Sequence, residues 1–300
     1  MWAQGVLRHD MRDTTEICWA ALDEAEYTDK RTGLPIPPKS TKELSKRTAH
    51  SQALWNPVID KEWNGLNDRN CFEHDQTITQ LKQRGLIPAK KIIPMRMLMT
   101  TKVDSTGNID KLKARNIVTG HKAYVRPGID YDTVFAAAPN IQATRLLQII
   151  AVTFNFVRFA YDITAAYLSG TAREDQRFPV RYPEGKIRDQ HRDPHTGEER
   201  YAILIGNLYG LPQSARVWAQ YRDDVYLNKL PEKYPGWKVE RMMYEQCMFK
   251  FTSPKGKISF KVIHTDDADG ISEDPDDAVA LVKMANELFM HKGKDGIVVG

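Results

Sequence analysis

Apolar residues recur at helical spacing in several stretches of the chain. Between residues 50 and 66 they fall three or four positions apart, at Leu54, Trp55, Val58, Ile59, Trp63 and Leu66. This spacing places them on one face of a helix. The same periodicity predicts helices over residues 140–152, 275–290 and part of 208–230.

Shorter apolar runs rich in β-branched residues predict strands. They cover residues 92–103, 112–118, 154–160, 201–205, 248–251 and 258–263. The turn signal at Gly107-Asn108 joins the first two runs into a β-hairpin. Because strands and helices alternate without long parallel βαβ units, the chain is predicted to be α+β with an antiparallel sheet.

The segments between these elements are polar or rich in turn residues. Residues 1–48 include a Pro-rich linker and are expected to be peripheral or poorly ordered, whereas residues 49–300 form the folded part. Residues 128–139 are expected to form a loop, and residues 184–200 an exposed hairpin tip between strands. The final residues are β-prone and lack terminal punctuation, which suggests a fragment cut inside a domain.

Charge is unevenly distributed along the sequence. The 300 residues carry 43 Lys plus Arg and 39 Asp plus Glu, a net charge of +4. Residues 82–126 hold eleven of the basic residues and only two Asp, a net +9, so the remainder is acidic at −5. One basic block in an otherwise acidic chain requires a functional explanation.

Composition excludes several classes of protein. No run of 18 apolar residues is present, so a membrane span is not expected. The three cysteines, Cys18, Cys71 and Cys247, are odd in number and far apart, which argues against a disulfide framework or a zinc site. A reducing intracellular setting fits this cysteine usage.

Two segments end in carboxylates that tertiary structure can bring together. Asp162 ends one apolar strand, and Asp266-Asp267 follow the strand at residues 258–263, 104 residues further on. If these two strands are neighbours, the carboxylates meet at one edge, where they suit two Mg²⁺ ions about 3.5–4 Å apart. The alternative is that Asp162 caps a helix starting at Thr164 and that the Asp pair marks a hairpin turn.

Five segments, in order, resemble the reverse transcriptase domain of copia-type long-terminal-repeat retrotransposons. The family's fingers hairpin is similar to LKARNIVTGHKA (112–123). Its Gly-Ile/Val-Asp-Tyr block is similar to GIDYDTVFAAAP (128–139). Its first catalytic motif is similar to YDITAAYLSG (161–170), and its Arg-x-Trp block is similar to LYGLPQSARVW (208–218). Its Asp-Asp motif is similar to VIHTDDADGIS (262–272). The resemblance covers roughly residues 50–300.

The resemblance implies a polymerase fold of fingers and palm, with an antiparallel palm sheet packed on helices and the thumb absent or truncated. It also implies three palm carboxylates, at Asp162, Asp266 and Asp267, that bind two Mg²⁺ ions, or Mn²⁺ in their place. By its position in the motif, Asp162 is expected to bind both metals together with Asp266, while Asp267 supports the site.

The resemblance further assigns residues to the incoming nucleotide. Lys113 and Arg115 lie in the basic hairpin, where the family contacts the triphosphate, and solvated charges on a hairpin are the alternative. Tyr167 takes the place of a steric gate against the ribose 2′-hydroxyl, and Gln213 that of a residue near the nucleotide. The alternatives are a buried core tyrosine and a polar residue at a helix N-terminus.

Four more positions concern helix packing and the primer. Arg216 and Trp218 are expected to organise their helix and its packing rather than to touch substrate. On the primer side, His264 and Thr265 stand where family members usually have Tyr-Val before Asp-Asp, so the aromatic contact to the primer is lost. The alternative interpretation of His264 is a substituted turn residue.

The resemblance thus predicts an RNA-directed DNA polymerase domain of a retrotransposon polyprotein, which transfers a deoxynucleotidyl group to a primer 3′-hydroxyl. Expected partners are an RNA or DNA template with its primer, deoxynucleoside triphosphates, and the RNase H and integrase domains of the parent element, with no membrane. The expected location is intracellular, in a cytoplasmic particle or the nucleus. Two alternatives stay open: a catalytically dead or truncated remnant that at most binds nucleic acid, and an unrelated metal-dependent phosphatase or nuclease.

Overall fold

The computed structural model describes residues 27–29, 31–169, 177–291, 294–295 and 297–299. The chain divides into two compact units, each discontinuous in sequence. The first unit comprises Met1–Tyr124 and Phe178–Leu204, and the second comprises Val125–Arg177 and Ile205–Gly300. Within the described residues, no helix is both long and apolar enough to cross a membrane.

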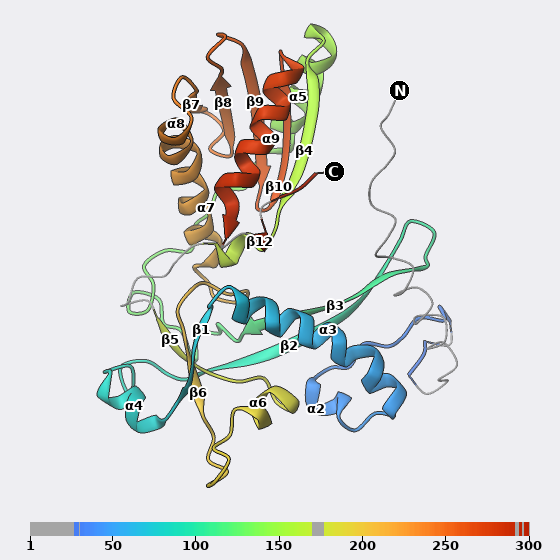
Figure 1. Cartoon of the computed structure of the whole chain (residues 1–300), viewed down its shortest axis with the longest axis vertical. Coiled ribbons are helices and arrows are strands. Elements are labelled where there is room, and N and C mark those ends of the chain that lie inside the picture. The colour runs from blue at the N-terminus through green and yellow to red at the C-terminus, as the bar shows by residue number, and fades with distance from the viewer. Residues whose placement is uncertain (1–26, 30, 170–176, 292–293, 296, 300) are drawn as a thin grey trace. The chain divides into compact units, whose positions relative to one another are not determined.

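The first unit is built on a five-stranded sheet in the order β1-β6-β5-β2-β3 (Figure 1). Its strands are β1 (Phe72–Gln76), β2 (Ile93–Val103), β3 (Ile109–Val118), β5 (Phe178–Arg181) and β6 (Tyr201–Leu204). Neighbouring strands are antiparallel except β2 and β5, which run parallel. The helices described in this unit are α2 (Thr41–Leu44), α3 (Ala49–Asp68), α4 (Ile78–Gln83) and α6 (Lys186–Gln190).

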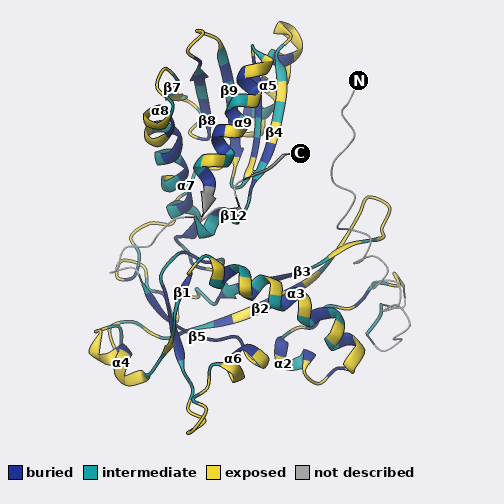
Figure 2. Cartoon of the chain, in the orientation of Figure 1, coloured by how far each residue is buried: buried dark blue, intermediate teal, exposed yellow. Residues whose placement is uncertain are grey.

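The long hairpin of β2 and β3 separates apolar from charged side chains by strand alternation. Met95, Met97 and Met99 on β2 are buried, as are Ala114 and Val118 on β3. Because successive side chains of a strand point to opposite faces, the charged residues between them lie on the other face. Helix α3 packs against β3 and buries most of the apolar stripe that the sequence predicts, namely Trp55, Ile59, Trp63 and Leu66 (Figure 2).

The second unit holds a six-stranded antiparallel sheet in the order β13-β4-β10-β9-β8-β7 (Figure 1). Its strands are β4 (Val157–Ile163), β7 (Lys238–Arg241), β8 (Met248–Thr252), β9 (Ile258–His264), β10 (Asp267–Ser272) and β13 (Ile297–Val299). Its helical segments are α5 (Ile141–Phe154), the 3-10 turn η2 (Ala166–Leu168), α7 (Ser214–Asp224), the π-helical turn η4 (Val225–Lys229), α8 (Leu230–Lys233) and α9 (Pro275–Phe289). A separate two-stranded ribbon joins β11 (Met290–His291) and β12 (Lys294–Asp295).

Helices cover both faces of this sheet and form two cores. One core joins α7 and α9 to the sheet through residues such as Trp218, Phe249 and Ile263. The other joins α5 to the opposite face through residues such as Leu147 and Val262. The neighbours Val262 and Ile263 enter different cores, as strand alternation requires. The central strands β4, β9 and β10 are therefore held from both sides.

The predicted helices and strands are confirmed with small shifts in their bounds, as is the mixture of helices with mainly antiparallel sheets. The sequence prediction missed several short elements, β1, α4, β5, β7 and β10 among them. The predicted hairpin tip at residues 184–200 contains the short helix α6. Residues 1–26 lie outside the described part, so the division between residues 48 and 49 stays a prediction.

Candidate metal-binding site

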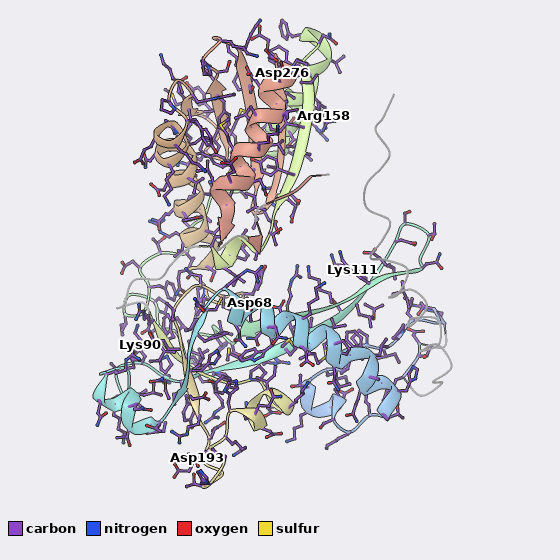
Figure 3. The ribbon with its side chains drawn as sticks, in the orientation of Figure 1. Asp68, Lys90, Lys111, Arg158, Asp193 and Asp276 are labelled. Atoms are coloured by element: carbon purple, nitrogen blue, oxygen red, sulfur yellow. The ribbon has the colours of Figure 1, made fainter. Side chains whose placement is uncertain are left out.

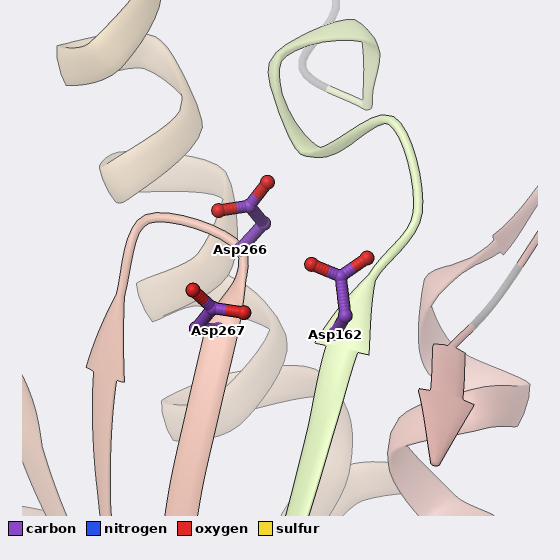
Figure 4. Close-up of side chains that lie close together, drawn as sticks. All are labelled: Asp162, Asp266 and Asp267. Atoms are coloured by element: carbon purple, nitrogen blue, oxygen red, sulfur yellow. The ribbon is translucent and has the colours of Figure 1, made fainter. Parts of the chain in front are cut away.

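Three carboxylates of the second unit gather at one end of its sheet (Figure 4). Asp162 lies near the end of β4, directly opposite Asp267, the first residue of β10. Asp266 lies in the turn that joins β9 to β10. One oxygen from each carboxylate can be chosen so that all three lie within 4.8 Å of one another.

The strands before Asp266 and around Asp162 are not direct neighbours, although the three carboxylates still meet. Strand β10 lies between β4 and β9 and pairs with both. In this register His264, Asp267 and Asp162 form a row across three strands. The β10 sequence, DADGIS, has low strand propensity, but pairing on both sides satisfies its backbone hydrogen bonds and makes it a strand.

The turn between β9 and β10 is strained, and hydrogen bonds to its two carbonyl groups hold it. Thr265 has a φ of 58°, in the left-handed region that a β-branched residue rarely adopts. Its carbonyl oxygen accepts a 2.7 Å hydrogen bond from the indole Nε1 of Trp218. The backbone N–H of Ile163 donates to the Asp266 carbonyl at 2.8 Å. These bonds tie the turn to α7 and β4, and they thereby fix the carboxylates that the turn carries.

The alternative in which Asp162 caps a following helix is wrong. That helix is only the turn η2, its N-cap residue is Ala165, and no side chain caps it. The Asp pair does adjoin a hairpin turn, yet this turn brings the carboxylates together. Asp162 and Asp266 are half-buried and Asp267 is exposed, so the cluster is open to a ligand. Carboxylate oxygens this close repel one another and attract a divalent cation.

Tyr167 and Gln213 belong to the same unit as the carboxylates. Tyr167 is half-buried in η2, and its ring packs edge-on against Tyr209 with 5.4 Å between the ring centroids. Gln213 is buried immediately before α7 and does not cap it. Its Oε1 has no hydrogen-bond partner among the described residues. A buried acceptor left without a partner is available to a ligand, but the assignment of both residues to a nucleotide stays a prediction.

The two primer-side residues lie beside the carboxylates. His264 is the last residue of β9, is exposed, and faces Asp267 across the strand pair. Thr265 begins the turn and contributes the carbonyl that Trp218 binds. Trp218 therefore organises packing, as the sequence predicts, and it also holds the turn, which the sequence did not reveal. Contact of His264 or Thr265 with a primer stays a prediction.

Lys113 and Arg115 lie in the first unit, on the charged face of the β2–β3 hairpin. Arg115 is exposed and Lys113 is half-buried. Partial burial lowers the pKa of Lys113, and the positive charges of Arg115, Lys102 and Lys111 lower it further. The carboxylate of Glu62 on α3 opposes this shift only in part. Binding of a triphosphate by Lys113 and Arg115 stays a prediction.

A buried lysine on β9, which contacts the residue before Asp162, was not predicted from the sequence. Lys261 on β9 is fully buried and donates to the Tyr161 hydroxyl at 2.6 Å, and Tyr161 shares a 2.8 Å hydrogen bond with Tyr226. Burial, followed by the charge of Arg222, lowers the pKa of Lys261 well below its usual value. Its Nζ lies 3.8 Å from the Tyr226 ring centroid. That contact favours the ammonium form and so opposes the lowering of the pKa.

An antiparallel sheet with three carboxylates at one end is a site of the kind that holds divalent cations. The family model of reverse transcriptase (RNA-dependent DNA polymerase) matches residues 85–248, which is more than half of the chain. The chain therefore belongs to the reverse transcriptase family, and the resemblance seen in the sequence is confirmed. The matched segment includes Asp162 and ends before Asp266.

Two Pol polyproteins of Arabidopsis thaliana are similar to part of the chain. The retrovirus-related Pol polyprotein from transposon RE1 is 31% identical over 127 residues, which make up 42% of this chain and 8% of that protein. The retrovirus-related Pol polyprotein from transposon RE2 is 29% identical over 131 residues, 44% of this chain and 8% of that protein. The match therefore covers a small part of either polyprotein.

Proposed function

We propose that this chain is the RNA-directed DNA polymerase domain of a retrotransposon polyprotein. Its substrates are a primer on an RNA or DNA template and deoxynucleoside triphosphates. Its reaction joins a deoxynucleotidyl group to the primer 3′-hydroxyl and releases pyrophosphate, and its partners are RNase H and integrase domains of the same polyprotein. Family membership supports the class of reaction. The observation that carries the proposal is the approach of Asp162, Asp266 and Asp267 to within 4.8 Å.

The carboxylate cluster fits two Mg²⁺ ions, with Mn²⁺ as an alternative. Mg²⁺ takes hard oxygen ligands, usually one or two carboxylates together with substrate phosphates, and three solvent-accessible carboxylates meet that need. Asp162 and Asp266 would hold the ions, and Asp267 would support them. When bound, the ions favour deprotonation of the attacking hydroxyl and neutralise charge on the departing pyrophosphate.

In this proposal the second unit is the palm, whose residues position the reactants. The turn anchored by Trp218 holds Asp266 and Asp267 beside Asp162, so the site needs little rearrangement before reaction. Tyr167 acts as the gate against a ribose 2′-hydroxyl. Gln213 offers its unpartnered Oε1 to the incoming nucleotide. Each of these side chains binds or orients a reactant.

The first unit is proposed as the fingers, which bind the triphosphate through the β2–β3 hairpin. Lys113 supplies a compact charge, and Arg115 supplies a planar fork that matches two phosphate oxygens. Both lie on the same strand face, where Arg115 is exposed and Lys113 is half-buried, and a nucleotide can approach them from that face. The basic block in the sequence is thereby explained as a phosphate-binding segment.

One observation favours a second candidate, a remnant that binds nucleic acid without catalysis. His264 replaces the aromatic residue that the family usually has, and it lies exposed opposite Asp267. An imidazole offers less stacking area than a phenol ring.

Primer extension on an RNA template with Mg²⁺ tests the polymerase proposal, and electron paramagnetic resonance measures Mn²⁺ binding independently of activity. Asp162→Asn removes one anionic ligand. We expect incorporation to fall by about 10³-fold or more, because several kcal/mol of charge stabilisation are lost. Mn²⁺ affinity should fall as well. The unfolding temperature should stay unchanged or rise, since repulsion among the carboxylates is relieved.

Asp269→Asn is the matched control, because Asp269 lies on β10, the strand that begins with Asp267, but pairs with Arg158 at 3.2 Å and is outside the cluster. It should keep incorporation and Mn²⁺ affinity within about twofold of the wild type, since exposed ion pairs contribute little. Wild-type incorporation by Asp162→Asn contradicts the proposal. A wild-type chain that binds nucleic acid but neither binds Mn²⁺ nor extends a primer indicates the remnant.

A further inference from the structure

A cavity of about 180 Å³ lies in the second unit. Its walls come from the loop at residues 128–139, from α7, from β7 and from Gln246, and none of the three clustered carboxylates lines it. Three arginines line it: Arg216 and Arg222 of α7 and Arg241 of β7. We call this cavity the arginine pocket.

The arginine pocket is held in shape by buried polar contacts. Arg222 is 3% exposed, and its Nε and Nη2 donate to Asp223 at 3.1 and 2.8 Å. The other oxygen of Asp223 accepts from Arg241. On the loop side, the Cys247 thiol donates to the Ala137 carbonyl at 3.2 Å. The guanidinium groups of Arg222 and Arg241 are therefore positioned before any ligand arrives.

Positive charge exceeds negative charge in the arginine pocket. Three guanidinium groups line it against one carboxylate, that of Asp223. Arg216 has no acidic partner among the residues that the structure describes, and its Nη1 makes a long 3.4 Å hydrogen bond to the Phe135 carbonyl. Glu245 precedes the lining residue Gln246, but its two oxygens already accept backbone N–H groups. This excess of positive charge favours an anionic ligand.

The neighbouring side chains favour a nucleic-acid strand over an acidic peptide. Phe135 lines the arginine pocket and is 65% exposed. Tyr244, two residues before the lining residue Gln246, is 97% exposed. Guanidinium groups bind phosphate oxygens in pairs, and exposed rings stack on bases. The arginine pocket and the exposed ring lie side by side, as a phosphate and the adjacent base do in a nucleic-acid strand.

We propose that the arginine pocket binds a backbone phosphate of a nucleic-acid strand, with Phe135 stacked on an adjacent base. The inference rests on the proposed function only in taking nucleic acid as the ligand. The sequence predicts that Arg216 organises its helix, and under this proposal Arg216 binds the strand instead. The contact is separate from the chemistry, because it needs neither a metal ion nor a nucleotide.

Fluorescence anisotropy with a labelled RNA–DNA primer–template tests the proposal in the absence of Mg²⁺ and nucleotide. Arg216→Gln removes one guanidinium and one long hydrogen bond. We expect the Kd at low salt to rise about 5–10-fold, and the slope of log Kd against log salt concentration to fall by about one. Arg216→Lys keeps the charge without the fork, so it should give a smaller rise and an unchanged slope.

Arg158→Gln is the matched control (Figure 3). Arg158 lies on β4 of the same unit, and it is an exposed arginine in an ion pair with Asp269. Its replacement removes the same charge outside the arginine pocket and should change the Kd less than about twofold. An equal loss in both variants would mean general charge attraction and would overturn the proposal.

Two further outcomes separate the arginine pocket from other sources of phosphate and from the proposed function. Unchanged strand affinity in Arg216→Gln overturns the proposal, and a raised KM for nucleotide in that variant would assign the pocket to the triphosphate. Weakened strand binding in Arg216→Gln supports binding of a strand in the arginine pocket, even if the wild type incorporates no nucleotide. A lack of incorporation by the wild type contradicts only the proposed polymerase function. If Arg216→Gln unfolds at a lower temperature, the Kd of Arg216→Lys decides: a raised Kd supports the arginine pocket, and a wild-type Kd overturns the proposal.

Discussion

The β2–β3 hairpin of the first unit and the β9–β10 hairpin of the second unit both carry clustered charges, and they are built in opposite ways. In β2–β3, Lys111, Lys113 and Arg115 follow one another at every second position along one face. In β9–β10, Asp266 and Asp267 lie at the turn itself, and a third strand brings Asp162 beside them. Like charges are thus spread along a surface in the first hairpin and concentrated at one point in the second.

This difference decides how much support each hairpin needs. Residues two positions apart on a strand are separated by about 7 Å, so these cations repel one another only weakly through solvent. Burial and, after it, this repulsion lower the pKa of Lys113, and the carboxylate of Glu62 opposes the shift only in part. The carboxylates lie within 4.8 Å, so a fixed turn has to oppose their repulsion. The first hairpin should therefore tolerate substitution, whereas the second depends on individual contacts.

The largest effect is expected where the second hairpin loses its anchor. Trp218→Phe keeps a ring in the core and removes the N–H that donates to the Thr265 carbonyl. Because Trp218 is 2% exposed, an unfilled space and an unsatisfied carbonyl together should lower the free energy of unfolding by about 2–3 kcal/mol. Urea unfolding measures this loss. Mn²⁺ affinity should fall with it, because the turn is no longer fixed.

Trp55→Phe is the control for this variant, because Trp55 is equally buried but lies on α3 of the first unit. It should lower stability and leave Mn²⁺ affinity unchanged. Wild-type Mn²⁺ affinity in Trp218→Phe would show that the indole supports the core and not the turn.

A smaller effect is expected from crowding the strand pair that aligns Asp162 with Asp267. Gly270 of β10 lies opposite Phe159 of β4, and a Cβ at Gly270 would come within 2.4 Å of the Phe159 ring. In Gly270→Ala the ring has to swing aside. We expect this to cost about 1–2 kcal/mol, because Phe159 is only half-buried and can move. Thermal unfolding measures the cost.

A double-mutant cycle with Phe159→Leu tests the cause of that loss. The smaller side chain leaves room for the added methyl group, so Gly270→Ala should cost less in the Phe159→Leu background. An equal cost in both backgrounds would exclude the Phe159 ring as the source of the strain.

Local signals account for what the sequence predicts well. Strand alternation in the β2–β3 hairpin, its turn at Gly107-Asn108 and the helical spacing in α3 each lie within a short stretch. Helix α5 shows the limit of such signals. The helix is where the pattern predicts it, yet its Ile141 and Ile149 are exposed, while Leu147 enters the core. A pattern of apolar residues predicts the element more readily than the face that is buried.

The candidate site could be predicted only in part, because it depends on register between distant segments. Motifs pointed to Asp162, Asp266 and Asp267, but no local pattern revealed β10 between their strands. Its partner β4 lies about a hundred residues earlier, and the pairing overrides the weak propensity of DADGIS. The arginine pocket could not be predicted from the sequence for the same reason, since its walls come from separate parts of the chain. Lys261 left one signal, a lysine inside the apolar run ISFKVI.

The smallest change in stability is expected in the first hairpin. Lys113→Ala combined with Arg115→Ala removes two cations from a charged strand face. The free energy of unfolding should change by no more than about 0.5 kcal/mol. Under the proposed function, the KM for deoxynucleoside triphosphate rises at low salt with little change in kcat. The rise shrinks in 1 M salt, where the Debye length is about 3 Å.

Lys102→Ala combined with Lys111→Ala is the matched control, because these lysines face one another further along the same hairpin face (Figure 3 labels Lys111). This control should keep the KM within about twofold, since its charges are also solvent-facing but lie outside the proposed contact. Equal rises in both double variants would indicate general attraction by the hairpin, and unchanged KM in both would remove the triphosphate role.

The pH dependence of the KM sharpens the test. Because the pKa of Lys113 is lowered, its charge is lost at a lower pH than that of an ordinary lysine. As pH increases, the wild-type KM should therefore begin to rise at a pH below that at which an ordinary lysine loses its charge. The variant lacking Lys113 should not show this rise.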